Sequence, residues 1–315
     1  MRIAILGATS QIAKDLISFL SLKTAYQLVL FARNVENVTS WLVGKNLPTF
    51  EVLTYTDLRL VGKFDAIVNF VGVGNPVVAN QIGASIFEVT RKFDQLALDY
   101  LLINPKCRYI FMSSGAAYGS NFEKPVSEHD NASVPINKIT PQNWYGISKL
   151  YAESVHRSMQ DLPIVDLRIF NYFSHTQDMD ARFLITDIIR AIRDKKIFET
   201  SEEIIFRDFI HPSDLFTLIH NILNLDPKNC VVDCYSQAPI DKLGLLDELK
   251  KEFNFDFRLV KNKSGLNVTG SKPYYFSLNR NAEIFNFKPA YSSLSGVIRE
   301  SHSFFENLGD NIVKH

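Results

Sequence analysis

The sequence predicts an α/β fold in which a doubly wound parallel sheet is joined to a smaller mixed α/β lobe. Two observations predict it. Short, almost unbroken apolar runs recur through the first half of the chain, and segments with helical spacing of apolar residues separate them. Strands buried on both faces lack polar alternation and belong to parallel sheets that helices cover on either side. The alternation of strands and helices then favours a doubly wound sheet.

The strands of the main sheet are predicted first, in chain order. They are the apolar runs at 2–6, 26–31, 50–55, 65–71, 107–113 and 163–170. Helices are expected between them because apolar residues three and four positions apart share one helical face. The first such face consists of Ile12, Leu16, Phe19 and Leu20, and the intervals 81–103 and 144–161 have room for longer helices.

After residue 170 the pattern is mixed and predicts the smaller lobe. A helix is expected at 181–195, and another after Ser213 or Asp214, either of which can cap a helix. Strands are expected at 230–235 and 256–261, followed by a polar loop at 262–273.

The change of pattern at residue 170 sets the predicted domain boundary. Residues 1–170 are expected to form the main domain, to which segments at about 205–236 return, and residues 171–315 the second lobe. No internal repeat or low-complexity linker separates the two parts, so we expect them to pack on each other.

Composition and charge exclude several classes of protein. Of the 315 residues, 46% are hydrophobic and 22% are charged, as in ordinary globular proteins. Because 34 basic residues balance 34 acidic ones without a long basic run, the charge pattern supports binding to neither nucleic acid nor a membrane surface. No segment approaches the ~20 apolar residues that span a bilayer, and the N-terminus does not resemble a signal peptide. We therefore expect a cytoplasmic protein.

The three cysteines, Cys107, Cys230 and Cys234, argue against a disulfide framework and for a reducing compartment. Cys230 and Cys234 lie in the apolar run Cys-Val-Val-Asp-Cys. They could form half of a metal site or pack as small apolar residues in a buried strand. Buried packing is favoured, and no metal site is predicted.

A turn that could receive a phosphate follows the first predicted strand. The segment Gly7-Ala8-Thr9-Ser10-Gln11-Ile12-Ala13 leads into the first helix, whose free amides and positive dipole end suit a pyrophosphate. Glycines let the backbone turn sharply there and approach the phosphates. Only Gly7 is present, so the turn alone leaves dinucleotide binding and an ordinary strand–helix turn equally open.

The end of the second predicted strand bears on the choice of cofactor. An acidic side chain there would bind the ribose 2′-hydroxyl of NAD, whereas an arginine accommodates the 2′-phosphate of NADP. The strand is followed by Arg33 and by no acid, which favours NADP, with an ordinary exposed arginine as the alternative. Asp57, after the third strand, could reach the adenine ring or cap a helix.

The strongest chemical signal is Tyr145-Gly146-Ile147-Ser148-Lys149 at the start of a predicted helix. A spacing of four residues puts Tyr145 and Lys149 on one helical face. A phenol with a pKa near ~10 is a poor acid–base group at neutral pH, but a nearby ammonium lowers that pKa. The pair could then exchange a proton with a hydroxyl or ketone. A surface tyrosine and lysine are the alternative.

A second segment strengthens this signal. The strand at 107–113 ends in Ser113-Ser114-Gly115-Ala116-Ala117-Tyr118-Gly119. Because doubly wound sheets bind ligands beyond the carboxyl ends of their strands, Ser114 is expected in the crevice. Its hydroxyl could hydrogen-bond a reacting oxygen and stabilise partial charge there.

With these segments the chain resembles the extended short-chain dehydrogenase/reductase family, the sugar-nucleotide epimerases and dehydratases. The similarity runs over nearly the whole chain. Besides the segments above, its motifs are Pro-Val-Ser-Glu at 125–128, Trp-Tyr-Gly-Ile-Ser-Lys-Leu-Tyr-Ala-Glu at 144–153, Arg-Ile-Phe-Asn at 168–171, Arg-Asp-Phe-Ile-His-Pro-Ser-Asp-Leu at 207–215, Asn-Arg-Asn-Ala at 279–282 and Phe-Asn-Phe-Lys-Pro at 285–289. Their order is specific for the family but not for one substrate.

The resemblance implies a Rossmann-type dinucleotide-binding domain at 1–170 and a nucleotide-sugar-binding lobe at 171–315. It implies Tyr145 as the acid–base, Lys149 as its helper and ribose ligand, and Ser114 as the third catalytic residue. Ser114 and Tyr145 would also touch the nucleotide-diphosphate sugar, whose diphosphate would be held by Asn171 and Arg207. The cofactor would contact Gly7, Thr9, Ser10, Gln11, Ile12, Arg33, Asp57, Leu58, Val71, Gly72 and Lys149. A turn residue at Asn171 and an ion pair of Arg207 with Asp208 are the alternatives.

Departures from the family narrow the expected reaction. The 4,6-dehydratases carry an Asp-Glu pair where this chain has Gly115 and Ala116, so dehydration is disfavoured. Fucose-type epimerase-reductases use an added cysteine and histidine; neither Ala116 nor a neighbouring residue is a cysteine, although His175 lies in a plausible loop. Simple hydride chemistry remains. Arg33 favours a 4-ketoreductase that uses NADPH. The alternative within the family is a 4-epimerase with bound NAD. A third hypothesis is a non-catalytic cofactor sensor with the same fold.

Two further departures concern the substrate. The family's usual arginine is missing near 267–270, where Lys263, Lys272 or Arg258 could substitute. The residues Tyr172, Phe173 and His175 also differ from the usual ones, so the sequence does not name the sugar or the base.

The resemblance also implies a homodimer. Family members pair through two long helices, here at about 86–103 and 144–161. The apolar side chains available on the first of them are Phe93, Leu96, Leu98 and Leu101, although some of these must face the sheet.

Overall fold

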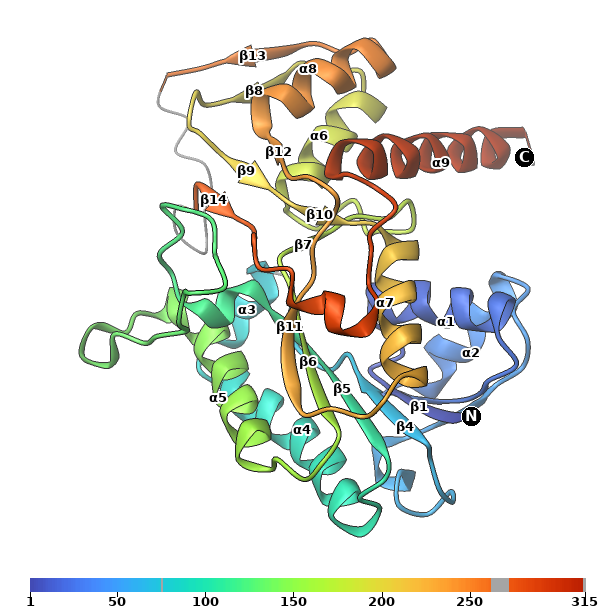
Figure 1. Cartoon of the computed structure of the whole chain (residues 1–315). Helices are drawn as coiled ribbons and strands as arrows, with labels where there is room; N and C mark the ends of the chain where they lie inside the picture. Colours follow the sequence, from blue (N-terminus) through green and yellow to red (C-terminus); the bar gives the residue numbers. More distant parts are fainter. Residues whose placement is uncertain (75, 262–271, 314–315) are drawn as a thin grey trace.

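The chain folds around one seven-stranded parallel sheet. The structure is a computed structural model that describes residues 1–74, 76–261 and 272–313 (Figure 1). Strands stand in the order β11-β6-β5-β4-β1-β2-β3. Their bounds are β1 Arg2–Leu6, β2 Gln27–Phe31, β3 Glu51–Leu53, β4 Ala66–Asn69, β5 Arg108–Ser114, β6 Ile164–Ile169 and β11 Cys230–Asp233. The strand order reverses between β1 and β4, and sheets of this type bind ligands outside the carboxyl ends at that point.

Helices cover both faces of this sheet, because successive side chains of a strand point to opposite sides. In β1, Ile3 and Ile5 pack in one core, whereas Ala4 and Leu6 pack in another, and all four are fully buried. The first core is closed by α1 (Gln11–Lys23), α2 (Val35–Gly44) and α7 (Pro212–Asn224), and the second by α4 (Ser85–Ile103) and α5 (Trp144–Ser158). Figure 1 shows these two helical layers on opposite sides of the sheet. The predicted fold class is confirmed.

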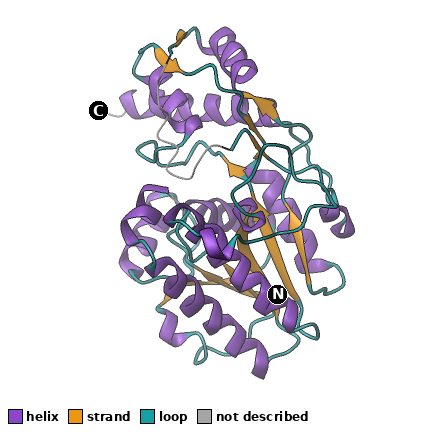
Figure 2. Ribbon diagram, turned by 90° about the vertical axis from the view of Figure 1, so that its left-hand side faces the viewer, coloured by secondary structure: helices purple, strands orange, loops and turns teal. Residues whose placement is uncertain are grey.

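The smaller lobe lies at the carboxyl ends of the main strands, as Figure 2 shows from the side. Its helices are α6 (Leu184–Arg193), α8 (Lys242–Phe253) and α9 (Ser293–Val313), which share a third apolar core. Its short strands are β7 Asn171–Tyr172, β8 Phe198–Thr200, β9 Phe206–Arg207, β10 Phe209–Ile210, β12 Ile240–Asp241, β13 Phe257–Leu259 and β14 Tyr274–Tyr275. The chain returns from this lobe through α7 and β11, and β11 pairs with β6 in parallel.

The long helix expected at about 86–103, within the interval 81–103, is confirmed as α4 (Ser85–Ile103). The structure has a short helix α3 (Pro76–Ile82), followed by α4 from Ser85. Gly83 lies between them with a φ of +55°, a left-handed conformation that favours glycine and ends a helix. Short 3₁₀ turns occupy Tyr55–Asp57, Gly115–Tyr118, Ile136–Lys138, Pro141–Asn143 and Asn281–Phe285.

The cysteines pack as small apolar residues in the sheet region. Cys107 and Cys234 are buried, and Cys230 is half-buried in β11. Among the residues that the structure describes, no cluster of three or more side chains could hold a metal ion. Within the same residues, every helix is too short or too polar to cross a bilayer.

Candidate active site

Tyr145 and Lys149 lie at the start of α5, on the side that packs toward the end of β5. The turn before the helix is capped by Asn143, whose side chain accepts hydrogen bonds from the amide and hydroxyl of Thr140 at 2.8 and 2.9 Å. A Cβ on Gly146 would lie 2.3 Å from the Ala116 carbonyl oxygen, so only glycine lets the helix approach the strand end this closely. The close approach places the phenol of Tyr145 beside Ser114.

Ser114 is the last residue of β5 and is 5% exposed. Its side chain caps the following 3₁₀ turn, accepting a hydrogen bond from the Ala116 amide at 3.2 Å. The Tyr145 phenol is hydrogen-bonded to the same side chain. Two of the predicted catalytic groups, which come from separate segments of the chain, are therefore in direct contact.

Lys149 is buried behind this pair and faces the loop after β4. Its Nζ donates a hydrogen bond to the Met112 carbonyl at 2.7 Å and lies 4.4 Å from the centre of the Phe111 ring. A Cβ on Gly72 would lie 3.2 Å from that Nζ, so the loop backbone lies close to the ammonium. Burial lowers the pKa of Lys149 to about 8, although the carboxylate of Asp94 opposes the shift.

The phenol of Tyr145 is affected differently from the sequence-based expectation. Burial raises its pKa above the usual value, and the hydrogen bond with Ser114 acts in the opposite direction. The expected lowering by Lys149 is not among the causes, and that ammonium donates to the Met112 carbonyl. Burial therefore outweighs the hydrogen bond with Ser114.

Gly7 forms the sharp turn between β1 and α1. Its φ is +80°, and a Cβ there would lie 2.9 Å from the Val71 nitrogen, so a side chain does not fit. Ser10 is the N-cap of α1, and its side chain makes no capping hydrogen bond within the described part of the chain. The first amides of the helix are thus left for another acceptor. A glycine cradle and a helix N-terminus of this kind fit the pyrophosphate of a dinucleotide.

Four other predicted cofactor residues near this turn differ in how far their side chains are exposed. Thr9 and Arg33 are exposed beside it. Ile12 is half-buried against the main core, and Leu58 is 1% exposed inside the second core. Of these four, Thr9 and Arg33 have the most exposed side chains, and only that of Leu58 is fully buried.

Two predicted cofactor residues have their side chains engaged elsewhere. The Asp57 carboxylate accepts hydrogen bonds from the amide and the hydroxyl of Thr54, at 3.1 and 2.6 Å. Of the two interpretations of Asp57, the structure therefore shows the cap. The Gln11 amide donates to the Thr176 hydroxyl in the loop after β7, which links the first helix to the second lobe.

The predicted diphosphate ligands, Asn171 and Arg207, hold the segment around β14. The Asn171 amide donates to the carbonyls of Asp208 and Tyr275 at 3.2 and 3.3 Å. An Arg207 Nη1 donates to the carbonyls of Phe206 and Lys272 at 2.7 and 2.8 Å. Burial lowers the pKa of Arg207 to about 10. The alternative of an ion pair with Asp208 is wrong, since that carboxylate accepts from Ser236 and Ser293.

Sequence reasoning missed Tyr275, which lies over Ser114. The Tyr275 hydroxyl is 3.1 Å from the Ser114 Oγ. Its ring packs 4.8 Å from that of Phe122 and 5.2 Å from that of Phe170. Burial raises the pKa of Tyr275 well above its usual value. No local pattern marks this residue, because β14 has only two residues and is too short to show strand periodicity.

Of the three candidates for the missing arginine, Lys272 is the one at the site. Its Nζ lies 4.8 Å from the centre of the Tyr275 ring, and burial beside Arg207 lowers its pKa to about 8. Arg258 forms an exposed ion pair with Glu199 instead. Lys263 and the segment 267–270 lie outside the described residues.

A small cavity opens between Tyr145 and Lys272. It has a volume of about 30 Å³, and its other lining residues include Ala116, Gly119, Pro135 and Gln142. The cavity therefore joins the acid–base group predicted on α5 to the buried lysine before β14.

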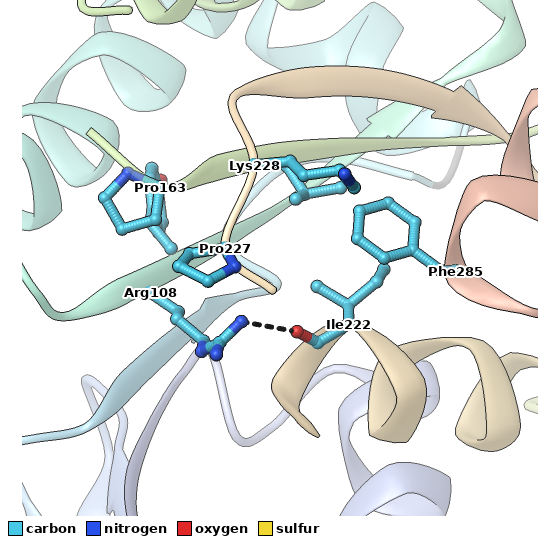
Figure 3. Close-up of a pocket in the computed structure, with 8 residues that line it drawn as sticks. Arg108, Pro163, Ile222, Pro227, Lys228 and Phe285 are labelled. Carbon is cyan, nitrogen blue, oxygen red and sulfur yellow. Dashed lines mark hydrogen bonds between the residues drawn. The ribbon is translucent and has the colours of Figure 1, made fainter. Parts of the chain in front are cut away.

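A second hollow lies near the amino ends of β5 and β6, beside the end of α7 (Figure 3). There Arg108 donates hydrogen bonds to the carbonyls of Ile222 and Leu225 at 3.0 and 2.6 Å. These carbonyls end α7, where a cation is favoured by the helix dipole. The arginine closes a helix end, far from the carboxyl ends of the strands.

The fold and the position of these groups define a class of α/β proteins that bind ligands at the switch point of a doubly wound sheet. The model of the NAD dependent epimerase/dehydratase family matches residues 3–232. Because this match covers most of the chain, the protein belongs to that family, and the resemblance seen in the sequence is confirmed. Comparison with curated proteins finds no match.

Solved structures share the fold over almost the entire chain. A UDP-N-acetylglucosamine 4-epimerase from Methanobrevibacter ruminantium M1, in complex with UDP-N-acetylmuramic acid, has a TM-score of 0.80 at 17% identity, covering 98% of both chains. A dTDP-glucose 4,6-dehydratase from Bacillus anthracis with NAD has a TM-score of 0.77 at 17% identity, covering 98% of this chain and 97% of the other. A UDP-glucuronic acid 4-epimerase from Bacillus cereus, with UDP-glucuronic acid and NAD, has a TM-score of 0.77 at 18% identity, covering 98% and 100%.

Proposed function

We propose that the protein is an NAD(P)-dependent oxidoreductase that reduces a 4-keto group on a nucleotide-diphosphate sugar. The observation that carries the proposal is the contact of Tyr145 with Ser114 at the strand ends, with Lys149 on the same helix facing Gly72. Family membership supports both the cofactor class and the substrate class. Solved structures with this fold contain NAD or nucleotide sugars, which fits the proposal.

In this proposal each side chain has a separate task. The chemistry that a nicotinamide cofactor would supply, when bound, is transfer of a hydride. Tyr145 gives its phenolic proton to the reacting oxygen, and the Ser114 hydroxyl donates a hydrogen bond that stabilises the partial charge there. The Lys149 ammonium would hold the nicotinamide ribose. The substrate oxygen takes the position on Ser114 that the Tyr275 hydroxyl holds, so binding requires an exchange of partners.

The substrate's diphosphate would be bound by Arg207 and Lys272, with Asn171 beside them. Both cations are largely withdrawn from water, and burial lowers the pKa of each. An anion placed between them would offset that cost, because charge-assisted bonds to phosphate are strong. This arrangement supports a diphosphate and disfavours a neutral sugar.

The geometry also argues against dehydration. A Cβ at Gly115 would lie 2.4 Å from carbons of the Phe170 ring. The acidic side chain that a dehydratase carries at this position therefore has no room without moving that ring. Ala116, which follows, has no group that could transfer a proton.

The proposed cofactor is NADP, with NAD as the alternative. Arg33 is exposed at the end of β2, where a 2′-phosphate would lie, and Asp57 is occupied as a cap. The solved structures that contain NAD favour the alternative. Replacing Arg33 by Ala should weaken NADPH binding by about tenfold and leave NADH binding nearly unchanged, since one charge-assisted contact is lost. Fluorescence titration with both cofactors measures this, and equal losses for the two would exclude the assignment.

The reaction is tested by incubating the protein with NADPH or NADH and a panel of nucleotide 4-keto sugars. Oxidation of NADPH in step with formation of a 4-hydroxy product establishes the reductase. The alternative is a 4-epimerase with bound NAD, which the 4-epimerases among the solved structures favour. It would convert a 4-hydroxy sugar into its epimer without net consumption of cofactor. Tight cofactor binding without turnover of any sugar would favour the non-catalytic sensor.

A further inference from the structure

A chain of buried hydrogen bonds runs from the loop that faces Lys149 into the interior between α4 and the sheet. The Val71 amide donates to the Asn69 side-chain oxygen at 2.9 Å. The Asn69 side-chain nitrogen donates to the Tyr109 hydroxyl at 2.8 Å, and that hydroxyl donates to Asp94 at 2.7 Å. The loop is thus joined by three successive bonds to a carboxylate on α4.

The same carboxylate is joined to α5 through His156. The His156 Nε2 lies 2.9 Å from an Asp94 oxygen, and its Nδ1 lies 2.6 Å from an oxygen of Asp166 on β6. Burial acts to lower the pKa of His156, but the two carboxylates outweigh it and raise the pKa to about 9. The ring is therefore charged at neutral pH and donates from both nitrogens. Arg157, which is partly exposed, donates a hydrogen bond of 3.0 Å to Asp166 and is the last member of this hydrogen-bond network.

These polar groups are withdrawn from water. The exposed fractions are 1% for Asn69, 4% for Asp94 and zero for Tyr109, His156 and Asp166. Buried polar groups cost free energy unless they are paired, and a fully connected network makes a rigid element. An interior of this kind fixes the relative position of the elements that it joins.

His156 also lies on the same helix as Lys149, seven residues further on, which is about two turns. The Phe111 ring separates the two side chains: the Lys149 Nζ lies 4.4 Å from its centre, and the His156 ring centre lies 5.3 Å away. The helix that carries Lys149 and the loop that Lys149 faces are therefore connected through one buried network.

We propose that Tyr109, Asp94 and His156 are positioning residues of the cofactor site. They hold α5 and the loop at 71–72 in one fixed relation, and thereby keep the Lys149 ammonium where the nicotinamide ribose binds. The inference rests on the proposed function for the identity of that ligand. The connection itself depends only on the hydrogen bonds above.

The test uses Tyr109→Phe, which removes the hydroxyl that links Asn69 to Asp94 and keeps the aromatic ring. Tyr100→Phe is the matched control, because Tyr100 belongs to the same core and is 3% exposed. Its hydroxyl accepts from the Phe64 amide at 2.8 Å and donates to the Gly62 carbonyl at 3.3 Å, at the other end of the sheet. Each change removes one buried hydroxyl, but only the first disconnects the loop.

Two measurements are made on the full chain. Hydrogen exchange without cofactor should be faster at residues 69–73 in Tyr109→Phe and unchanged there in Tyr100→Phe. Fluorescence titration should show NADPH binding weakened about fivefold in the first variant only, the effect of one lost hydrogen bond. Asp94→Asn, which keeps the shape of the side chain, serves as a second variant if Tyr109→Phe does not fold, and the same two changes are expected.

The outcomes separate this inference from the proposed function. Equal effects of the two tyrosine variants, or unchanged exchange at 69–73 in Tyr109→Phe, would overturn the positioning role while leaving the proposed function intact. Failure of the unmodified protein to bind NADPH or NADH would overturn the proposed function, and the cofactor part of the inference with it.

Discussion

The charge of the buried Lys149 side chain is set by two opposing influences on its pKa. Burial alone favours its neutral form, and the carboxylates of Asp94, Glu153 and Asp166 restore part of the charge, so that its pKa is about 8. At neutral pH most of the ammonium is then still charged. An ammonium withdrawn from water interacts more strongly with a nearby phenol or ribose than one on the surface.

The first prediction at the residue scale concerns Tyr145. Tyr145→Phe removes the transferable proton and keeps the ring, so the rate of sugar reduction should fall by about 10²-fold or more while cofactor binding stays within about twofold. Tyr151→Phe is the matched control, because Tyr151 lies on the same helix and is 51% exposed. Steady-state kinetics of both variants measure the effect. An unchanged rate in Tyr145→Phe would place the acid–base group elsewhere.

The second prediction concerns stability and pH. The pKa of Lys149 is lowered from 10.5 to about 8 in the folded chain, so between these values the unfolded chain binds a proton that the folded chain has lost. Its contribution to the free energy of unfolding therefore increases with pH across this window, by roughly 3 kcal/mol in total. Lys149→Met should remove that increase.

Urea denaturation across this pH window measures the difference. Lys106→Met is the control, because Lys106 is exposed and its loss should leave the increase with pH in place. The same dependence on pH in the unmodified protein and in Lys149→Met would show that this lysine is not desolvated.

At the scale of an element, the turn from β1 to α1 shows why one glycine suffices. Gly7 alone has the left-handed conformation, with a φ of +80°, whereas Ser10 has ordinary extended backbone angles as the N-cap. Ala13 is fully buried in the core, so its methyl group fits where the glycine-rich fingerprint of dinucleotide-binding folds carries its third glycine. The reduced glycine content of the motif therefore does not prevent the turn from forming.

The third prediction follows from this geometry. Gly7→Ala should lower stability by about 1–3 kcal/mol, because its methyl group meets the Val71 backbone at an unfavourable φ. It should also weaken NADPH binding, since the loop at 71–72 must move. Gly44→Ala is the control: no described atom lies within 4 Å of its added Cβ, and it should be neutral or slightly stabilising. Thermal unfolding and cofactor titration measure both variants.

At the scale of the whole molecule, the two parts of the chain are interleaved. The chain leaves the main sheet after β6, builds part of the second lobe, and returns through α7 and β11 before ending in α9 (Figure 1). The Asp15 carboxylate on α1 also accepts hydrogen bonds from Tyr172 and Thr176 of the second lobe, both at 2.6 Å. The predicted main domain at 1–170, with return segments at about 205–236, likewise expects the chain to cross between the parts more than once.

The fourth prediction is the homodimer through α4 and α5. Of the apolar residues named for it, Leu98 and Leu101 are buried in the core of the monomer, whereas Phe93 and Leu96 are half-buried. A contact would use the latter two together with exposed side chains such as Leu102 and Tyr151. Sedimentation at micromolar concentration should give a dimer that Tyr151→Lys weakens. Leu259→Lys, at an exposed site of the second lobe, is the control and should leave it intact. A monomer in the unmodified protein would contradict the prediction.

Local sequence patterns accounted for much of the fold but for less of the site. The strands β1, β2 and β5 match the apolar runs closely, because burial on both faces leaves a pattern in consecutive residues. Apolar spacing does not register the left-handed conformation of Gly83, so the break between α3 and α4 is seen only in the structure. The helix α2 was missed, although Asn34 caps it with a bond of 3.0 Å from the Asn37 amide.

At the site, the sequence by itself determined the family, the glycine turn and the pairing of Tyr145 with Lys149 on one helical face, because each of these depends on residues close together in the chain. Only the tertiary structure decided that Tyr275 lies on Ser114, that Asp57 is a cap, and that burial governs the pKa values of Tyr145 and Lys149. Ser114 and Tyr275 are 161 residues apart. No local pattern predicts a contact over that separation, because it is set by how the second lobe packs on the ends of the main strands.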